Sequence, residues 1–329
     1  MVNWGIIGCG NVTELKSGPA FSKVEGSRLV AVMRRDAALA EDYARRHNVP
    51  KFYSRADDLI NDRDINAIYV ATPPASHAEY AIASIKAGKP VYIEKPMALN
   101  YAECEKINKA SEKYKVPVFV AYYRRLLPGY LKVKQLIENG SIGKVYFVQV
   151  QLFKAPTEDE KAGKLPWRVV PEISGGGHFF DLASHQLDYL DYLFGPIQDI
   201  NSLVRNQAGF YKAEDFVTAN FAFGNNIAGT GTWSFGVLPE NERDIIEIFG
   251  EKGSIRFSTY SFDPIVLTNS LGHQEFENER PEHVQYNLIE GIVRFLNGKG
   301  TVPSTGLTAA RTSKVMDEIV RGFYRTPKI

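Results

Sequence analysis

The first third of the chain alternates short apolar runs with helical patterns, and this alternation restricts the possible folds more than any other feature. Strands separated by helices of such length indicate βαβ units, which place their strands in a parallel sheet. The apolar runs are Trp4–Ile7, Leu29–Met33, Ala67–Ala71, Val91–Ile93 and Val118–Ala121. The helical patterns are Ala37–Arg46, Ala56–Leu59, His77–Ala87 and Tyr101–Tyr114. We therefore predict an α/β domain with a doubly wound parallel sheet.

The pattern changes after residue 121, where alternating strand-like segments become dominant. Turn signals such as Gly224-Asn225-Asn226 separate several of these segments, as hairpins require. The expected strands are Val145–Phe153, Ile197–Val204, Phe216–Phe223, Ile227–Phe235, Asp244–Phe249, Ser254–Phe257 and Pro264–Leu267. The expected helices are Tyr130–Glu138, His178–Phe194, Glu282–Leu296 and Leu307–Tyr324. Because 329 residues exceed one ordinary core, we expect two domains: residues 1–121, and an α+β domain with a mostly antiparallel sheet over 122–329.

Composition and charge exclude several classes of partner. The formal net charge of +1 argues against a nucleic acid or a charged membrane surface. No segment has the length that spans a bilayer, and the N-terminus enters a strand without the basic start of a signal peptide. The two cysteines, Cys9 and Cys104, are too few for a disulfide framework and fit a reducing compartment. We expect a cytoplasmic protein with a small-molecule partner.

A glycine-rich turn follows the first strand. In Gly8-Cys9-Gly10-Asn11-Val12-Thr13, the two glycines allow a tight turn and a close approach of the backbone to a pyrophosphate at a helix N-terminus. Thr13 stands where the fingerprint has its third glycine, so an ordinary glycine turn is the alternative. With the βαβ units that follow it, this turn indicates a dinucleotide site formed by Gly8, Gly10, Asn11 and Val12.

The end of the second strand bears on the choice of dinucleotide. Enzymes that prefer NAD usually carry an acid there, which binds the ribose 2′-hydroxyl. Arg34 stands at this position and Arg35 follows it. Because a guanidinium binds a 2′-phosphate with two donors, we favour NADP(H). Asp36 could still serve a 2′-hydroxyl, so NAD stays possible, and a solvated arginine is the structural alternative.

Thr72-Pro73 follows the third apolar run, and His77 opens the next helix. These residues are expected to line the nicotinamide-ribose side of the crevice at the strand ends. For His77, a purely structural role at the start of the helix is an equal alternative.

Lys95 lies at the end of a short buried strand, where an unpaired ammonium loses hydration. Asp181 and His185 follow a glycine run, Gly175–Gly177, and their spacing of four places them on one helix face. Reduction of a carbonyl requires a proton for the developing alkoxide and positive charge nearby. His185 can supply the proton, Asp181 can orient the imidazole, and Lys95 can polarise the oxygen. The alternative is a structural Asp–His pair beside a salt-bridged lysine.

The helix after the glycine run carries four potential metal ligands, which could suggest a metal site. His178 and Asp188 lie near the same face as Asp181 and His185, but the helix is otherwise apolar. No further His or Cys cluster supports zinc, so we expect no metal.

The sequence resembles the glucose–fructose oxidoreductase, inositol dehydrogenase and rhizopine-catabolism (Gfo/Idh/MocA) family over essentially its whole length. The resemblance rests on Gly8-Cys9-Gly10-Asn11, on Glu94-Lys95-Pro96, and on Gly175-Gly176-Gly177 with Asp181 and His185. It implies a Rossmann domain and a second domain whose open-faced sheet forms a homo-oligomer, either a dimer or a tetramer. It also implies NAD(P)-dependent oxidation of an alcohol, or reduction of a carbonyl, on a sugar or polyol.

The resemblance assigns individual residues as well. It implies a catalytic set of Lys95, Asp181 and His185, with Glu94 and Lys95 bordering the nicotinamide and a cis peptide bond before Pro96. The implied substrate-binding residues are Tyr123, Arg124, Trp167 and Arg168. Two residues depart from the family pattern, Thr13 in the glycine turn and Arg34 in place of the acid of NAD-dependent members.

Two other functions use the same fold. One is an NAD-dependent glycosidase or epimerase that oxidises its substrate transiently and retains its cofactor. The other is a non-catalytic regulator that binds a dinucleotide, against which the intact set of Lys95, Asp181 and His185 argues.

Overall fold

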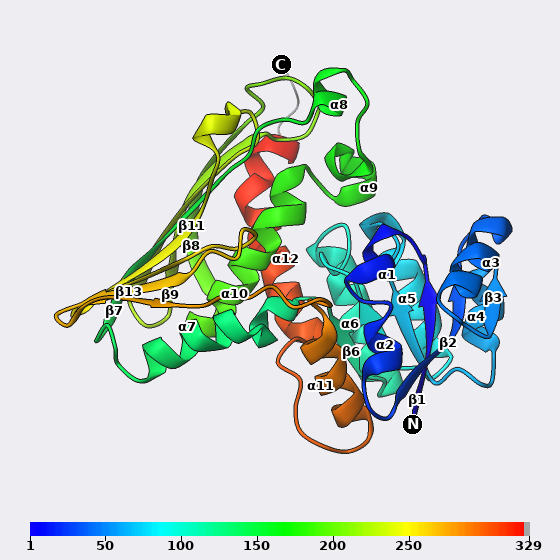
Figure 1. Ribbon diagram of the computed structural model, residues 1–329. Coiled ribbons are helices and arrows are strands. Elements are labelled where there is room, and N and C mark those ends of the chain that lie inside the picture. Colours follow the sequence, from blue (N-terminus) through cyan, green and yellow to red (C-terminus); the bar gives the residue numbers. More distant parts are fainter. Residues whose placement is uncertain (326–329) are drawn as a thin grey trace. The chain divides into compact units, whose positions relative to one another are not determined.

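The computed structural model describes residues 1–325, which form two compact units (Figure 1). The first unit contains Met1–Tyr123 and also Pro281–Ala310. The second contains Arg124–Arg280 and residues 311–325. The return of residues 281–310 to the first unit is not anticipated by the sequence patterns. The functional division into residues 1–121 and 122–329 stays a prediction.

The first unit contains the predicted doubly wound parallel sheet. Its six strands have the order β3-β2-β1-β4-β5-β6, and every neighbouring pair is parallel. The strands are β1 (Val2–Ile7), β2 (Ser27–Met33), β3 (Lys51–Tyr53), β4 (Ala67–Val70), β5 (Val91–Ile93) and β6 (Val118–Val120). The helices are α1 (Asn11–Leu15), α2 (Ala20–Lys23), α3 (Ala37–Arg46), α4 (Ala56–Asn61), α5 (His77–Lys86), α6 (Tyr101–Tyr114) and α11 (Tyr286–Leu296). This strand order places the change of winding direction between β1 and β4, where open α/β sheets bind their ligands.

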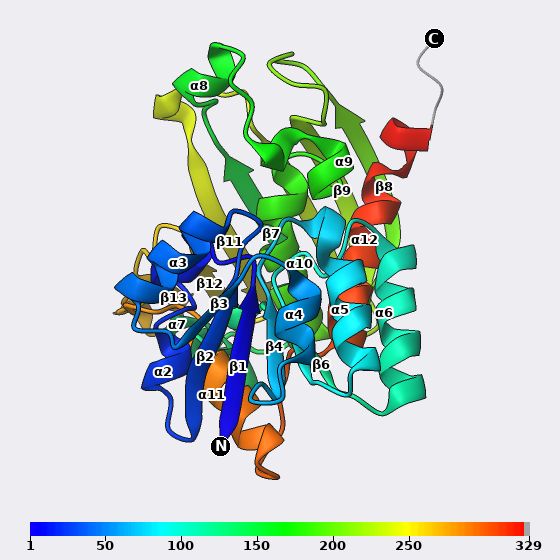
Figure 2. The same ribbon diagram turned by 90° about the vertical axis from the view of Figure 1, so that its right-hand side faces the viewer.

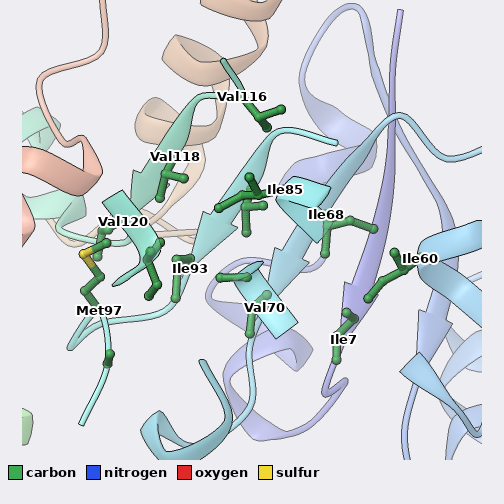
Figure 3. Packing of buried hydrophobic residues seen from close by; sticks show 14 of the residues in the cluster. Ile7, Ile60, Ile68, Val70, Ile85, Ile93, Met97, Val116, Val118 and Val120 are labelled. Carbon is green, nitrogen blue, oxygen red and sulfur yellow. The ribbon is translucent and has the colours of Figure 1, made fainter. Parts of the chain in front are cut away.

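Successive residues of these strands point to opposite faces of the parallel sheet. One face is aliphatic and packs against α4, α5 and α6 (Figure 2), in a cluster that includes Ile7, Val70 and Ile93 (Figure 3). The opposite face is aromatic. Tyr69 and Tyr92 stack there with ring centroids 4.9 Å apart. Both faces are therefore buried, as expected for a parallel sheet, and ligands of such sheets bind at the carboxyl ends of the strands.

The second unit is built on an eight-stranded sheet with the order β14-β13-β12-β11-β7-β10-β9-β8. Its strands are β7 (Val145–Phe153), β8 (Ile197–Arg205), β9 (Phe216–Phe223), β10 (Ile227–Ser234), β11 (Arg243–Gly250), β12 (Gly253–Phe257), β13 (Ile265–Asn269) and β14 (Gly272–Phe276). Its helices are α7 (Pro128–Glu138), α8 (Glu158–Lys161), α9 (Pro171–Ser174), α10 (Ser184–Phe194) and α12 (Gly306–Arg325). Only β10 and β7 pair in parallel within this described sheet, so the predicted, mostly antiparallel sheet is confirmed.

The two faces of this second sheet differ. Helices α7, α10 and α12 lie along one face (Figure 1), where alternate residues such as Val148 and Val150 are buried. On the other face, Phe147 and Phe249 stack in parallel with centroids 4.4 Å apart. Phe147 is 40% exposed, because no element among residues 1–325 of this unit covers that face.

The helix predicted over His178–Phe194 is not uniform. Phe179–Ala183 form a wider, π-helical turn, and α10 begins only at Ser184. Among residues 1–325, no helix combines the length and apolar character that a membrane crossing requires.

Candidate active site

The glycine turn after β1 has the geometry that a pyrophosphate requires. Gly8 has a φ of 93°, and a Cβ at this position would lie 2.6 Å from Cγ2 of Thr72. A Cβ on Gly10 would meet only the carbonyl oxygen of Gly8, at 3.9 Å, so the space above Gly10 is open. Gly10 precedes α1 without a side-chain cap, which leaves the first amides of α1 to an anionic ligand. The turn therefore fits the pyrophosphate of a dinucleotide, and the contact of Gly8, Gly10, Asn11 and Val12 with a cofactor stays a prediction.

Thr13 replaces the third glycine without disturbing this turn. Its hydroxyl donates to the Gly10 carbonyl at 2.8 Å, and its own carbonyl accepts from the Tyr43 hydroxyl at 2.8 Å. The close packing that the third glycine normally allows occurs at Gly18 instead. A Cβ on Gly18 would lie 2.1 Å from the carbonyl oxygen of Thr13.

The arginines after β2 are exposed and available to a ligand. Within residues 1–325, no carboxylate is paired with the guanidinium of Arg34 or Arg35. Asp36 is engaged, because its Oδ1 accepts the backbone N–H of Leu39 at 3.1 Å and caps α3. Burial raises the pKa of the Cys9 thiol to about 11, and the positive charge of Arg34 acts in the opposite direction. Arg34 therefore lies near the glycine turn that contains Cys9. The basic group at this strand end is therefore available, while the nearby acid is used structurally.

His77 joins two loops at the carboxyl edge of the sheet. Its Nε2 lies 2.6 Å from the carbonyl oxygen of Thr72, and its Nδ1 lies 3.0 Å from that of Pro96. The ring is fully buried, and burial lowers its pKa. His77 thus holds the loops after β4 and β5 together. Contact of Thr72, Pro73 or His77 with a cofactor stays a prediction.

Lys95 follows β5 at the same edge. Between Val91 and Ala98 it is the one residue that is not buried, so its position differs from that of all its neighbours in the segment. The peptide bond between Lys95 and Pro96 is cis. Lys95 therefore lies at the edge of the sheet at which parallel strands bind ligands.

Glu94 is held by a buried network on the aromatic face. Its Oε1 accepts from the Tyr69 hydroxyl at 2.5 Å and from Nε2 of Gln285 at 2.6 Å. Its Oε2 accepts the backbone N–H of Lys95 at 3.1 Å. Gln285 in turn accepts from the Tyr92 hydroxyl at 2.7 Å. The Glu94 carboxylate therefore fixes the backbone of Lys95, and its contact with a nicotinamide stays a prediction.

In the second unit, the structure brings together three of the predicted site residues. Nε of Arg168 lies 3.1 Å from Oδ2 of Asp181. The guanidinium of Arg168 also lies over the Trp167 ring, 4.5 Å from its centroid. This group combines an aromatic face, a cation and a partly exposed carboxylate, which suits a polyhydroxylated ligand.

His185 is buried one turn further along the helix. It is 2% exposed, and its ring lies edge-on to the Tyr260 ring with centroids 6.4 Å apart. Arg124 is also buried, and its guanidinium donates to the Thr259 carbonyl and lies over the same Tyr260 ring. Tyr123 belongs to the first unit and is nearly buried. The substrate contacts of Tyr123, Arg124, Trp167 and Arg168 stay predictions.

Comparison with protein families decides the identity of the fold. Residues 2–122 match the model of an oxidoreductase family with an NAD-binding Rossmann fold, and residues 130–256 match the Gfo/Idh/MocA C-terminal domain. The chain belongs to the Gfo/Idh/MocA oxidoreductase family. It is therefore an oxidoreductase with an NAD-binding Rossmann domain, as the sequence resemblance implied.

Relatives of this Gfo/Idh/MocA member match it over most of their length. It is 42% identical to Oxidoreductase P35 of Formosa agariphila, over 96% of this chain and 97% of that protein. It is 30% identical to trans-1,2-dihydrobenzene-1,2-diol dehydrogenase of Xenopus laevis, over 88% and 90% of the two chains. The structure of a levoglucosan dehydrogenase in complex with NADH and levoglucosan shares the fold, with a TM-score of 0.85, 23% identity, and coverage of 98% and 97%.

Other polar residues near the predicted site of this Gfo/Idh/MocA protein have structural partners. His178 lies 2.6 Å from Oε1 of Glu160, and Asp188 forms a bidentate pair with the buried Arg125. Among the described residues, no group of three His, Cys, Asp or Glu side chains is arranged to hold a metal.

Sequence reasoning missed two partners of the site, Gln285 and Tyr260. Neither belongs to a local motif, and each becomes visible only when distant segments fold together. Lys95 belongs to the first unit, whereas Asp181 and His185 belong to the second. Their meeting around one nicotinamide therefore stays a prediction.

Proposed function

We propose that this Gfo/Idh/MocA protein is an NADP(H)-preferring enzyme that transfers a hydride between the nicotinamide and a CH–OH or carbonyl group of a sugar or polyol. The observation that carries the proposal is the position of Lys95, the only residue between Val91 and Ala98 that is not buried. A lysine that follows a parallel strand at the ligand-binding edge suits an oxygen that gains negative charge. The relative that is a trans-1,2-dihydrobenzene-1,2-diol dehydrogenase and the levoglucosan dehydrogenase of the same fold support an alcohol substrate.

The proposed roles follow from the chemistry of the side chains. The bound nicotinamide accepts or donates the hydride. Lys95 polarises the substrate oxygen, and His185 gives the proton to that oxygen or removes it. Asp181 stabilises the protonated imidazole. Trp167 and Arg168 contact the face and the hydroxyls of the sugar, and Tyr123 and Arg124 are further substrate-binding residues.

The catalytic assignment is tested with Lys95→Met and His185→Ala, on a panel of levoglucosan, myo-inositol and D-glucose. We expect turnover, followed by the absorbance of reduced nicotinamide, to fall by at least about a hundredfold in each variant, the usual contribution of a general acid or base. Turnover like that of the wild type in both variants would refute the assignment. Turnover of a substrate by protein that retains its dinucleotide, with no net change in absorbance, would instead indicate the glycosidase or epimerase.

The preference for NADP(H) rests on Arg34, exposed after β2, and on Asp36, whose carboxylate caps α3. We expect Arg34→Ala to weaken NADPH binding about tenfold or more, because a charge-assisted hydrogen bond contributes about 1.5–3 kcal/mol. NADH affinity should change little. Arg45→Ala is the matched control, since Arg45 is an exposed arginine of α3 that pairs with Asp42. Tighter binding of NADH than of NADPH by the wild type would contradict the preference.

We also propose a cytoplasmic homo-oligomer formed through the uncovered face of the eight-stranded sheet. The stacked Phe147 and Phe249 on this face support the proposal, because monomers seldom expose large apolar patches. Light scattering should give the mass of a dimer or tetramer for the wild type and a lower mass for Phe147→Lys. A monomeric wild type at micromolar concentration would contradict it.

A further inference from the structure

Two backbone carbonyls of the π-helical turn Phe179–Ala183 accept hydrogen bonds from side-chain hydroxyls. In a π turn the hydrogen bonds run from each carbonyl to the fifth residue beyond it, and such turns are held at functional sites by local partners. The Ser184 hydroxyl donates to the carbonyl of Asp181 at 3.2 Å. The Tyr260 hydroxyl donates to the carbonyl of Leu182 at 2.6 Å. Tyr260 therefore reaches this turn from a loop 78 residues further along the chain.

The loop that presents Tyr260 is itself firmly held. The Asp244 carboxylate accepts the backbone N–H groups of Thr259 at 2.9 Å, of Tyr260 at 2.5 Å and of Ser261 at 3.1 Å. From the other side, Arg124 donates to the Thr259 carbonyl at 2.9 Å and covers the Tyr260 ring, 4.6 Å from its centroid. The phenol is thus fixed at its backbone and at its ring before it meets the turn.

The hydroxyl lies where it influences two proposed reacting groups. Leu182 directly follows Asp181, and the Tyr260 ring contacts the ring of His185 at 6.4 Å and 69°. Successive residues of an α-helix differ in direction by about 100°. A change of this turn from π to α geometry would therefore turn Asp181 away from its present direction relative to His185.

We propose that Tyr260 is a positioning residue, which holds the π-helical turn and so sets the directions of Asp181 and His185. The inference rests on the proposed function of these two residues in proton transfer. It assigns Tyr260 a role that is exerted through the Leu182 carbonyl.

Tyr260→Phe tests the proposal, because it removes the hydroxyl and keeps the ring. The matched control is Tyr189→Phe, which loses an equivalent bond from a buried hydroxyl to the carbonyl of Tyr130, 2.5 Å away. We expect Tyr260→Phe to lower kcat about tenfold or more on the sugar of the panel that the wild type turns over fastest, with KM for NADPH unchanged. The control should lose a similar amount of thermal stability and keep kcat.

Two readouts do not depend on turnover. A crystal structure of Tyr260→Phe should show a shifted or α-helical turn at residues 179–183. The Cε1–Hε1 resonance of His185 should also move, although the ring beside it remains. A variant that keeps the π turn, the resonance and kcat would overturn the inference and leave the proposed function intact. Full activity of His185→Ala would instead overturn the proposed function, while the structure and the resonance would still decide the role of Tyr260.

Discussion

Glu214 makes the stability of this protein depend on pH in an unusual direction. Its side chain is fully buried and accepts the backbone N–H of Gly177 at 2.9 Å and the hydroxyl of Tyr324. Burial raises the pKa of this carboxyl from 4.5 to about 7, although both hydrogen bonds lower it. The folded chain therefore keeps the proton of Glu214 at pH values where the unfolded chain has released it. Stability is full below the unfolded pKa and is lost as the pH rises toward the folded one.

The size of the effect follows from the two pKa values. A pKa shift of one unit corresponds to about 1.36 kcal/mol. With a pKa of 4.5 in the unfolded chain and about 7 in the folded chain, the free energy of unfolding should fall by about 2.5 kcal/mol between about pH 5 and about pH 8. Glu214→Gln is uncharged at every pH and avoids this loss. Urea denaturation of both proteins across this range should therefore show the variant gaining about 2.5 kcal/mol relative to the wild type as the pH rises.

A further variant sharpens the test. Tyr324→Phe removes a hydrogen bond that lowers the pKa of Glu214, so the loss of stability should extend to higher pH. A difference between Glu214→Gln and the wild type that stays constant with pH would refute the reasoning. The glycine run before Asp181 would then be held by a carboxylate that is ionised throughout.

Three other predictions concern buried partners. Gln285→Leu removes a donor to Glu94 and should lower the free energy of unfolding by about 2–4 kcal/mol in urea denaturation, and a loss below about 1 kcal/mol would contradict this. Arg125→Met leaves Asp188 buried without its ion pair and should lower the free energy of unfolding by about 3–5 kcal/mol, whereas the double variant with Asp188→Leu should recover most of this loss. A double variant as unstable as the single one would argue against an unpaired charge as the cause. Gly18→Ala places a methyl group 2.1 Å from a backbone oxygen of α1 and should weaken NADPH binding in a fluorescence titration, and unchanged affinity would show that α1 adapts.

The sequence predicted most of the strands, because buried residues leave a continuous apolar run in the first sheet and an alternating pattern in the second. It missed β3, in which Lys51 is polar and Phe52 is 42% exposed. It also missed β14 at the edge of the second sheet, where nearly all residues are exposed. These two edge strands bury little and so carry a weak apolar signal, whereas the edge strand β6 is fully buried and was predicted.

The site shows the same division between local and distant information. Lys95, Arg34 and the glycine turn could be placed because each follows directly from a strand end. The partner of Glu94 could not, since Gln285 lies 191 residues away and no spacing rule connects the two. The π turn was predicted as ordinary helix, because the apolar residues around it suit either form and its hydroxyl partner, Tyr260, comes from another loop.

The return of residues 281–310 to the first unit has a consequence for biosynthesis. A ribosome that has made the whole parallel sheet still lacks Gln285, so the Glu94 carboxylate emerges without one of its buried donors. The nucleotide-binding half is therefore completed only after most of the intervening half has been made. A fragment ending near residue 123 should be prone to aggregation, whereas a chimera that rejoins residues 281–310 to it should fold.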